Sequence, residues 1–190
     1  MKLGDLLDEA EERALKIVSE KSPELPEAQK KEIARVVGLG AVKYADLLPN
    51  RQNDYIFSWD KMLALQGNTA PYLQYAYARI RSIFRKSETS NIQHLTSDIQ
   101  LTTPEELALA KHLLNFGLTL EAVAEELRPN YLCNYLYELA SKFTSFYENC
   151  PVLKADSEAA RDSRLALCDL TARVLKQGLE TLGIETVEQM

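Results

Sequence analysis

The chain has 190 residues, of which 46% are hydrophobic and 26% are charged, a composition that allows one well-buried globular core without disulfide or metal staples. Acidic residues outnumber basic ones by 28 to 22, and the formal net charge of -6 excludes a generally basic surface, so any polyanion must bind at a local patch. Cys133, Cys150 and Cys168 are odd in number and widely spaced, which argues against a disulfide framework or a zinc site and favours a reducing cytosol.

The amino terminus opens with MKLGDLLDEAEERA, in which charged residues interrupt every apolar run. This pattern is that of neither a signal peptide nor a transit peptide, and no window further along approaches the roughly 18 apolar residues of a membrane span. A cytoplasmic protein without membrane contact is therefore expected.

Apolar residues at three- and four-residue spacing predict an amphipathic helix that begins near Leu3 and ends before Pro23. Pro26 can open a second helix, which continues to about Leu48, because the first helical turn tolerates a missing N–H. Two glycines, at positions 38 and 40, interrupt its apolar series and are interpreted as points of close helix packing or a kink.

Residues 53–59, NDYIFSW, are the strand-like stretch of the sequence and are interpreted as an extended connector. Asn68 or Thr69 can then cap a helix that Pro71 opens and that runs to about Lys86. Its predicted buried side consists of Leu73, Tyr77, Ile80 and Phe84.

A polar, aperiodic loop of about 88–103 separates a first helical half, about 1–87, from a second, about 104–190. Thr103 and Glu106 predict a capping box at the start of the second half. Thr119 is interpreted as the cap of a further helix, and Pro129 opens a long helix that Pro151 ends.

The last helix is expected over about 156–182, closed by Gly183 in the position that follows a helix end. The sequence thus predicts an all-α helical bundle, treated as one domain of 1–190.

Catalytic constellations are not evident in the pattern. His94 and His112 lie far apart without partners at metal or triad spacing, and both are interpreted as solvent-facing or capping residues. The segment GLGAVK lacks both the third glycine of a dinucleotide turn and the end of a P-loop. No catalytic residue, metal ligand or cofactor site is therefore predicted.

The helix predicted from Pro71 raises a specific question, because the stretch GNTAPYLQYAYARIRSIFRK contains rings and cations but no carboxylate. At about 100° per residue, one quarter of its circumference collects Tyr72, Tyr75, Arg79, Ser82 and Lys86. Arg81 and Arg85 flank this side and could reach acids on neighbouring helices or a phosphate chain.

Two interpretations of this surface remain open from the pattern alone. Exposed rings beside cations suit single-stranded RNA, because unstacked bases lie on aromatic faces while Arg and Lys take phosphates and base edges. Tyrosines at this spacing also form the wet rim of a core, and arginines near acidic helices make structural ion pairs.

The exact residues of the sequence say more about its function than the pattern of apolar and polar positions does. The stretch GAVKYADLLPNRQNDYIFSWDKMLALQGNTAPYLQYAYARIRSIFRK closely resembles the junction of catalytic and anticodon-binding domains in arginyl-tRNA synthetases of class I. The resemblance continues through YLYELASKFTSFYENCPVL, through SRLALCDLTARVLKQGLETLGI and to the final TVEQM. It implies a helical anticodon-binding domain of the DALR type.

The resemblance also implies what the chain lacks. Neither the His-x-Gly-His type motif nor the Lys-Met-Ser-Lys type loop of class I catalytic domains occurs in the sequence. The opening KLGDLLDEA resembles the segment that follows that loop, so Met1 is expected to be an introduced start. We therefore expect no aminoacylation and no cofactor in this chain, whereas the parent arginine–tRNA ligase would use ATP and Mg.

The same resemblance implies the site residues. Tyr147 and Met190 enter from the resemblance only, and Pro151 stands where relatives can carry a larger ring. The residues that it implies around the anticodon loop of tRNA(Arg) are Tyr72, Tyr75, Arg79, Arg85, Lys86, Tyr147 and Met190.

Every arginine codon has G in the middle, so every arginine anticodon has C there, and one pocket can serve all isoacceptors. The expected pocket for this cytosine consists of Tyr72, Arg79, Tyr147 and Met190, with Tyr75, Arg85 and Lys86 supporting neighbouring bases or phosphates.

The first two helices are expected to pack against the catalytic domain of the parent enzyme, and a monomer is expected otherwise. The alternative function is a non-catalytic helical module, derived from such a domain, that binds protein. The net charge of -6 fits that alternative, because an acidic body repels RNA.

Overall fold

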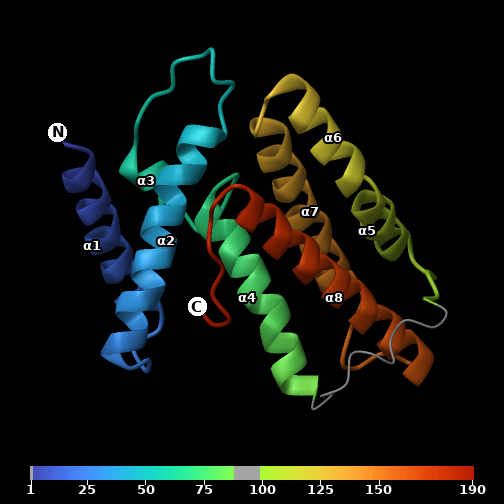
Figure 1. The fold of residues 1–190 in the computed structure, drawn as a ribbon. Helices are drawn as coiled ribbons and strands as arrows, with labels where there is room; N and C mark the ends of the chain where they lie inside the picture. Colours follow the sequence, from blue (N-terminus) through green and yellow to red (C-terminus); the bar gives the residue numbers. More distant parts are fainter. Residues whose placement is uncertain (1, 88–98) are drawn as a thin grey trace.

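The computed structural model describes residues 2–87 and 99–190, and every regular element within these ranges is a helix (Figure 1). The predicted all-α fold class is confirmed, whereas most of the predicted loop of 88–103, with His94, lies outside the described residues. The helices are α1 (Leu3–Lys21), α2 (Glu27–Leu47), α3 (Trp59–Met62), α4 (Ala70–Ser87), α5 (Pro104–Leu114), α6 (Phe116–Glu126), α7 (Asn130–Asn149) and α8 (Glu158–Thr181).

Helices α1 and α2 form an antiparallel hairpin with a small core of its own (Figure 1). Gly38 makes the close approach possible, because a Cβ atom there would lie 2.8 Å from the carbonyl carbon of Ala10 on α1. The interpretation of this glycine as a packing point is confirmed. The hairpin core includes Ala14, Val18, Ile33, Val37 and Ala41.

The larger core lies between α4, α5, α7 and α8. Helix α7 contributes aromatic and aliphatic side chains on one face, among them Phe143 and Phe146, and α8 faces it with Leu165 and Leu175. Helix α4 stands between this core and the hairpin (Figure 1). The fully buried side chains of this core are mostly leucines: Leu73, Leu109, Leu132, Leu136, Leu139, Leu165, Leu167 and Leu175.

A buried ion pair connects α5 to α8. The Nε atom of Arg164 donates to Oε1 of Glu106 at 2.7 Å, and both side chains are nearly inaccessible. The other carboxylate oxygen of Glu106 accepts from the backbone N–H groups of Thr102 and Thr103, which completes the predicted capping box. Both carboxylate oxygens of the buried Glu106 thus accept hydrogen bonds within the protein in place of those that water would donate.

These contacts set the acidity of Glu106. Burial on its own raises its pKa, but the hydrogen bonds from Arg164 and from the two backbone N–H groups outweigh that effect and hold the pKa below its usual range. The carboxylate is therefore charged in the folded protein at every pH above the usual range for glutamate.

Two expectations for the second half are wrong. Helix α6 begins at Phe116, so Thr119 lies inside it and its hydroxyl donates to the carbonyl of Asn115 instead of capping a helix. His112 is buried rather than solvent-facing: its Nε2 atom lies 3.0 Å from the carbonyl oxygen of Tyr135, and the two rings stack at 4.4 Å.

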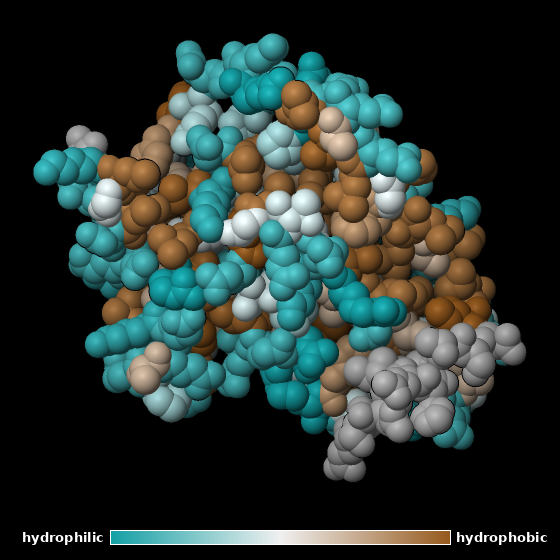
Figure 2. Space-filling view, in the orientation of Figure 1, coloured by the Kyte–Doolittle hydropathy of each residue, from teal (hydrophilic) through white to brown (hydrophobic). Residues whose placement is uncertain are grey.

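The expectation that no window of the sequence approaches a membrane span is wrong for the segment of helices α5 and α6. By length and composition alone, Pro104–Glu126 is long and apolar enough to cross a membrane. Its mean hydropathy is 1.2 over a window of 18 residues, and 11% of that window is buried. Its inner side packs on α7, while Lys111 and Glu121 lie in the same segment. Leu107, Leu114 and Leu118 remain exposed, and Figure 2 shows hydrophobic side chains gathered over these helices.

The remaining boundaries follow the turn chemistry of the sequence. Residues 54–58 form a connector without regular structure, in which Ser58 is extended, but the short helix α3 that follows them was not predicted. Ser157 caps α8 by accepting from the N–H of Ala160, and Gly183 follows its end with a φ of 71°, the left-handed conformation expected of it.

We predict that Gly38→Ala destabilises the fold by about 1–3 kcal/mol, because the new methyl group meets rigid backbone of α1 rather than a movable side chain. Gly117→Ala is the matched control: a Cβ atom there meets nothing within 4 Å among the described residues, and alanine raises helix propensity by about 0.5–1 kcal/mol. Urea unfolding measures both, and equal stability of the two variants would contradict the packing role.

We also predict that Glu106→Gln lowers the unfolding free energy by about 3–5 kcal/mol at pH 7, because Arg164 stays buried without its counter-charge. A pKa that is lower in the folded than in the unfolded state stabilises above about pH 4.3, and this contribution is lost as pH falls through the folded value. The gap between wild type and variant should therefore shrink in acid, as thermal unfolding at several pH values would show. Glu105→Gln on the same turn should change stability by less than about 0.5 kcal/mol.

Candidate nucleic-acid interface

Helix α4 has two chemically different sides. Thr69 caps it by accepting from the N–H of Tyr72 at 3.2 Å, so the capping prediction is confirmed for this residue. The predicted buried side is confirmed as well, since Leu73, Tyr77, Ile80 and Phe84 are all buried. On the other side Tyr75 is 43% exposed. The outward residues are thus fixed in place by a well-packed inner side.

A groove of about 690 Å³ lies between α4, the carboxyl end of α7 with the turn that follows it, and the tail after α8. This volume is within the usual range of about 300–1,000 Å³ for ligand pockets. We call it the ring-and-cation groove. It brings together six of the seven residues that the sequence analysis named: Tyr75, Arg79, Arg85, Lys86, Tyr147 and Met190.

Tyr72, the seventh residue, lies apart from the groove lining. Its half-buried ring packs against Tyr137 of α7 at 5.8 Å, and its hydroxyl lies 3.5 Å from Oγ1 of Thr144. Three of the four residues expected to form the cytosine pocket, Arg79, Tyr147 and Met190, therefore line the same groove. Tyr72 lies one turn before Tyr75 on α4 and packs against α7.

Arg79 and Tyr147 form the centre of the groove. The guanidinium carbon of Arg79 lies 4.4 Å from the centroid of the Tyr147 ring, which itself packs on Phe143 at 6.0 Å. A cation held over an aromatic face forms a flat, charged layer, and guanidinium planes stack on bases as readily as aromatic rings do. The pair thus offers a stacking platform next to a donor.

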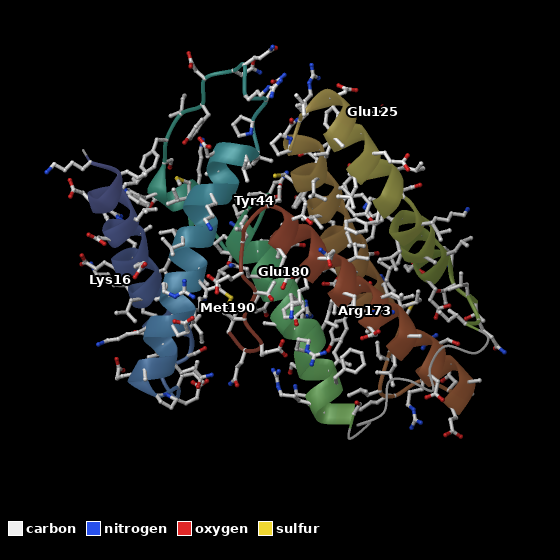
Figure 3. The ribbon with its side chains drawn as sticks, in the orientation of Figure 1. Lys16, Tyr44, Glu125, Arg173, Glu180 and Met190 are labelled. Atoms are coloured by element: carbon white, nitrogen blue, oxygen red, sulfur yellow. The ribbon has the colours of Figure 1, made fainter. Side chains whose placement is uncertain are left out.

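The tail that follows α8 closes the groove and is held by α4. Tyr77 donates to Oε1 of Glu188 at 2.7 Å, and Nε of Arg81 donates to Oε2 at 2.7 Å. Arg85 donates to the backbone carbonyl of Glu188 at 2.8 Å. Met190, two residues further on, lines the groove, and Figure 3 shows this residue between α2 and α4.

These hydrogen bonds shift the pKa values of the partners in opposite directions. Burial first, and then the bond to Glu188, raises the pKa of Tyr77 to about 12. Burial alone raises the pKa of Glu188, but the hydrogen bonds from Arg81 and Tyr77 outweigh it and hold the carboxyl below its usual range. At neutral pH the clamp is therefore made by an ionised carboxylate and a neutral phenol.

Sequence reasoning missed two polar residues of the groove wall. Lys154 lies in the turn after α7 and Gln189 precedes the last residue. A lysine three residues after Pro151 was the available signal, but it becomes meaningful only once the turn is known to face α4. Pro151 itself lines the groove.

The groove is basic on an acidic protein. Four cationic side chains line it, namely Arg79, Arg85, Lys86 and Lys154, and within the described ranges its lining includes no Asp or Glu side chain. The groove is therefore a positively charged patch on a protein whose formal net charge is -6. Such a site attracts an anion locally while the rest of the surface repels it.

Other hollows have different chemistry. A hollow of about 840 Å³ between α2, α3 and the start of α4 is mainly apolar, with Tyr44, Ile56 and Met62 in its wall. Another runs along α1 and is lined by five acidic residues together with Lys16 and with Arg13, which lies over the ring of Trp59 at 5.1 Å. In neither hollow do cationic side chains outnumber carboxylates.

The cysteines are buried, and burial raises the pKa of Cys133 to about 12 and that of Cys168 further still. Thiols of this kind are poor nucleophiles. In the parts of the chain that the structure describes, no group of three or more His, Cys, Asp or Glu side chains is placed to hold a metal ion.

The DALR anticodon binding domain model matches residues 73–190. The chain belongs to this family. The matched range includes most of α4, all of α5 to α8 and the tail, and therefore every residue of the ring-and-cation groove. A second model, the catalytic domain of class I tRNA synthetases (R), matches residues 1–59, which hold α1 and α2.

Relatives of this DALR anticodon binding domain are arginine–tRNA ligases. The chain is 56% identical over its full length to the arginine–tRNA ligase of Proteus mirabilis and 55% identical to that of Escherichia coli O127:H6, and it covers 33% of each. It thus spans about a third of the curated relatives that it matches.

Solved structures agree with these matches. The arginyl-tRNA synthetase of Thermus thermophilus superimposes with a TM-score of 0.92 at 36% identity, covering 100% of this chain and 32% of the other. That of Plasmodium falciparum gives a TM-score of 0.90 at 35% identity, covering 100% of this chain and 34% of the other. The assignment of 1–190 to one domain stays a prediction.

Proposed function

We propose that this DALR anticodon binding domain binds the anticodon loop of tRNA(Arg) in the ring-and-cation groove, as the carboxyl-terminal part of an arginyl-tRNA synthetase. The observation that carries the proposal is the groove itself. It gathers two tyrosines and four cations from three separate segments, α4, the end of α7 with its turn, and the tail, on a protein that is otherwise acidic. The family match and the named relatives support the same function.

The groove offers different chemistry at its ends and at its centre. Arg85 and Lys86 at the end of α4, with Lys154 opposite them, can take phosphates of the loop and fix its register. Arg79 over Tyr147 at the centre can receive a splayed base by stacking and hydrogen bonding. Met190 supplies a soft, polarizable side chain that fits the edge of a base.

The base proposed for the centre is the cytosine in the middle of the anticodon. This base is common to all arginine isoacceptors, because every arginine codon has G at its second position. A single pocket that reads cytosine can therefore serve the complete set. Tyr75 stands exposed beside the centre and can support a neighbouring base.

The catalytic step is proposed for the parent enzyme only. Residues 1–59 match the catalytic domain model, yet the two nucleotide-handling motifs of class I enzymes are not in the sequence. We propose that the parent attaches arginine to tRNA using ATP and Mg, and that the present chain alone does not. The hairpin of α1 and α2 is the proposed contact with the rest of that catalytic domain.

We predict that Tyr147→Ala weakens binding of an arginine anticodon stem–loop by about 1–3 kcal/mol, the value of one base-stacking contact. Tyr147→Phe keeps the ring and the contact with Arg79, so it should lose less than half of this amount. Fluorescence anisotropy with labelled RNA measures both. Unchanged affinity in Tyr147→Ala would remove this residue from the site.

We further predict that replacing the middle C of the stem–loop by U reduces affinity, and that affinity falls with salt. With at most four groove cations in contact, the slope of log K against log salt should not be steeper than about -3. Equal binding of both RNAs would indicate a general electrostatic surface. A protein-interaction module, the alternative function, would bind neither RNA.

A further inference from the structure

Glu188 is the acidic residue closest along the chain to Met190, and all of its polar contacts are made to α4. One of its carboxylate oxygens accepts a hydrogen bond from Tyr77 and the other accepts one from Arg81, each at 2.7 Å. Its backbone carbonyl accepts a hydrogen bond from Arg85. Three consecutive turns of α4 therefore hold one residue of the tail. An ordinary surface ion pair uses a single partner and adds little to stability.

We infer that Glu188 is a positioning residue that places Met190 in the wall of the ring-and-cation groove and so prepares the groove for the anticodon base. This inference rests on the proposed function for its RNA part, while its structural part concerns this chain alone. The tail holds no other side-chain contact to α4 this close to its end in the described structure.

Met190 needs such placement because it contacts two units at once. It lines the groove next to Tyr75, and it also packs against the hairpin core near Ile17 and Val18 of α1. The tail beyond Glu188 forms no helix that would hold it there. A clamp two residues earlier leaves only Gln189 between the fixed point and the thioether.

Further back, the tail is fixed by contacts of a different kind. Gln74 donates to the backbone carbonyl of Glu185 at 2.8 Å, and Arg35 of α2 binds its carboxylate with two hydrogen bonds. These contacts hold residue 185 against α2 and α4 but lie five residues from the end of the tail. Val187 is buried in the hairpin core, and Glu188 makes the last polar contacts of the tail before the groove in the described structure.

The sign of the change in RNA affinity when Glu188 is replaced distinguishes a positioning role from a purely electrostatic one. Glu188 places a negative carboxylate near an anion-binding groove, so its removal would strengthen RNA binding if only electrostatics mattered. Loss of positioning would weaken binding instead. The positioning role therefore predicts the opposite of what a purely electrostatic role predicts.

The experiment uses Glu188→Gln and Tyr77→Phe, with Glu148→Gln as the matched control. Tyr77→Phe breaks one of the hydrogen bonds to Glu188 without changing any charge. Glu148 follows Tyr147 on α7, is exposed and, among the described residues, forms no ion pair, so its substitution removes the same charge without touching the tail.

The first readout needs no RNA. The sequence contains three methionines, so methyl-labelled methionine gives a simple spectrum in which Met190 is assigned by Met190→Leu. We expect the Met190 methyl resonance of Glu188→Gln to move towards its position in an unfolded peptide, while Glu148→Gln leaves it unchanged. A Met190 resonance that stays in place in Glu188→Gln overturns the inference.

The second readout is anisotropy with stem–loops that carry C or U in the middle. We expect Glu188→Gln to bind the C form about fivefold more weakly and with a smaller preference over U, and Tyr77→Phe to show a smaller loss of the same kind. Circular dichroism checks that the melting temperature stays near that of wild type. Binding of Glu188→Gln that equals or exceeds that of wild type overturns the RNA part of the inference.

The two proposals fail in different ways. Wild-type protein that binds neither stem–loop overturns the proposed function, and the methyl spectrum then still decides whether Glu188 places Met190. Wild-type protein that reads C against U, with an unmoved Met190 resonance in Glu188→Gln, supports the proposed function and overturns the inference.

Discussion

The structure depends on the burial of one side of α4. Leu73 and Ile80 are fully enclosed, and Gln74 between the two cores donates to backbone carbonyls of α2 and of the tail. Its Oε1 atom is a buried side-chain oxygen without a hydrogen-bond partner among the described residues, a cost that the two donated bonds offset. A helix fixed in this way cannot rotate, so the groove residues on its other side keep their spacing.

Such rigidity has a direct consequence for binding. A stacking site must hold its ring and its cation within a fraction of an ångström before the base arrives, because ordering them on binding would cost affinity. Arg79 already lies over Tyr147, and Phe143 supports the ring from the core side. The centre of the groove is therefore organised by packing, whereas its open end, with Lys86 and Lys154, is left to electrostatics.

Local chemistry made most helices predictable from the sequence. Thr103 with Glu106, Thr69 before Pro71 and Gly183 after α8 act through groups a few residues away, so their roles can be deduced from the sequence order. The prediction that Thr119 caps a helix was wrong because it used only local polar residues. Apolar residues that pack on α7 extend α6 back to Phe116. A partner that is distant in sequence decided the boundary.

The site was predictable only in part because its contacts are long-range. Tyr77 and Glu188 are 111 residues apart, and a terminal glutamate two residues from a methionine carries no periodic signal. The pattern of rings and cations on α4 was visible, yet Tyr147 and Met190 came from family resemblance. Tyr72 shares one side of α4 with Tyr75 and Arg79 by angle, but its ring packs against Tyr137 of α7 and does not line the groove.

The same contacts sort the cations of α4 into two classes. The charge of Arg81 is neutralised by the carboxylate of Glu188, whereas Arg85 donates a hydrogen bond to the uncharged backbone carbonyl of the same residue. Arg79, Arg85 and Lys86 line the groove, and none of them forms an ion pair with a carboxylate among the described residues. In the proposed complex the acidic body would repel an RNA loop and the groove would attract it, so the charge pattern would give orientation in addition to affinity.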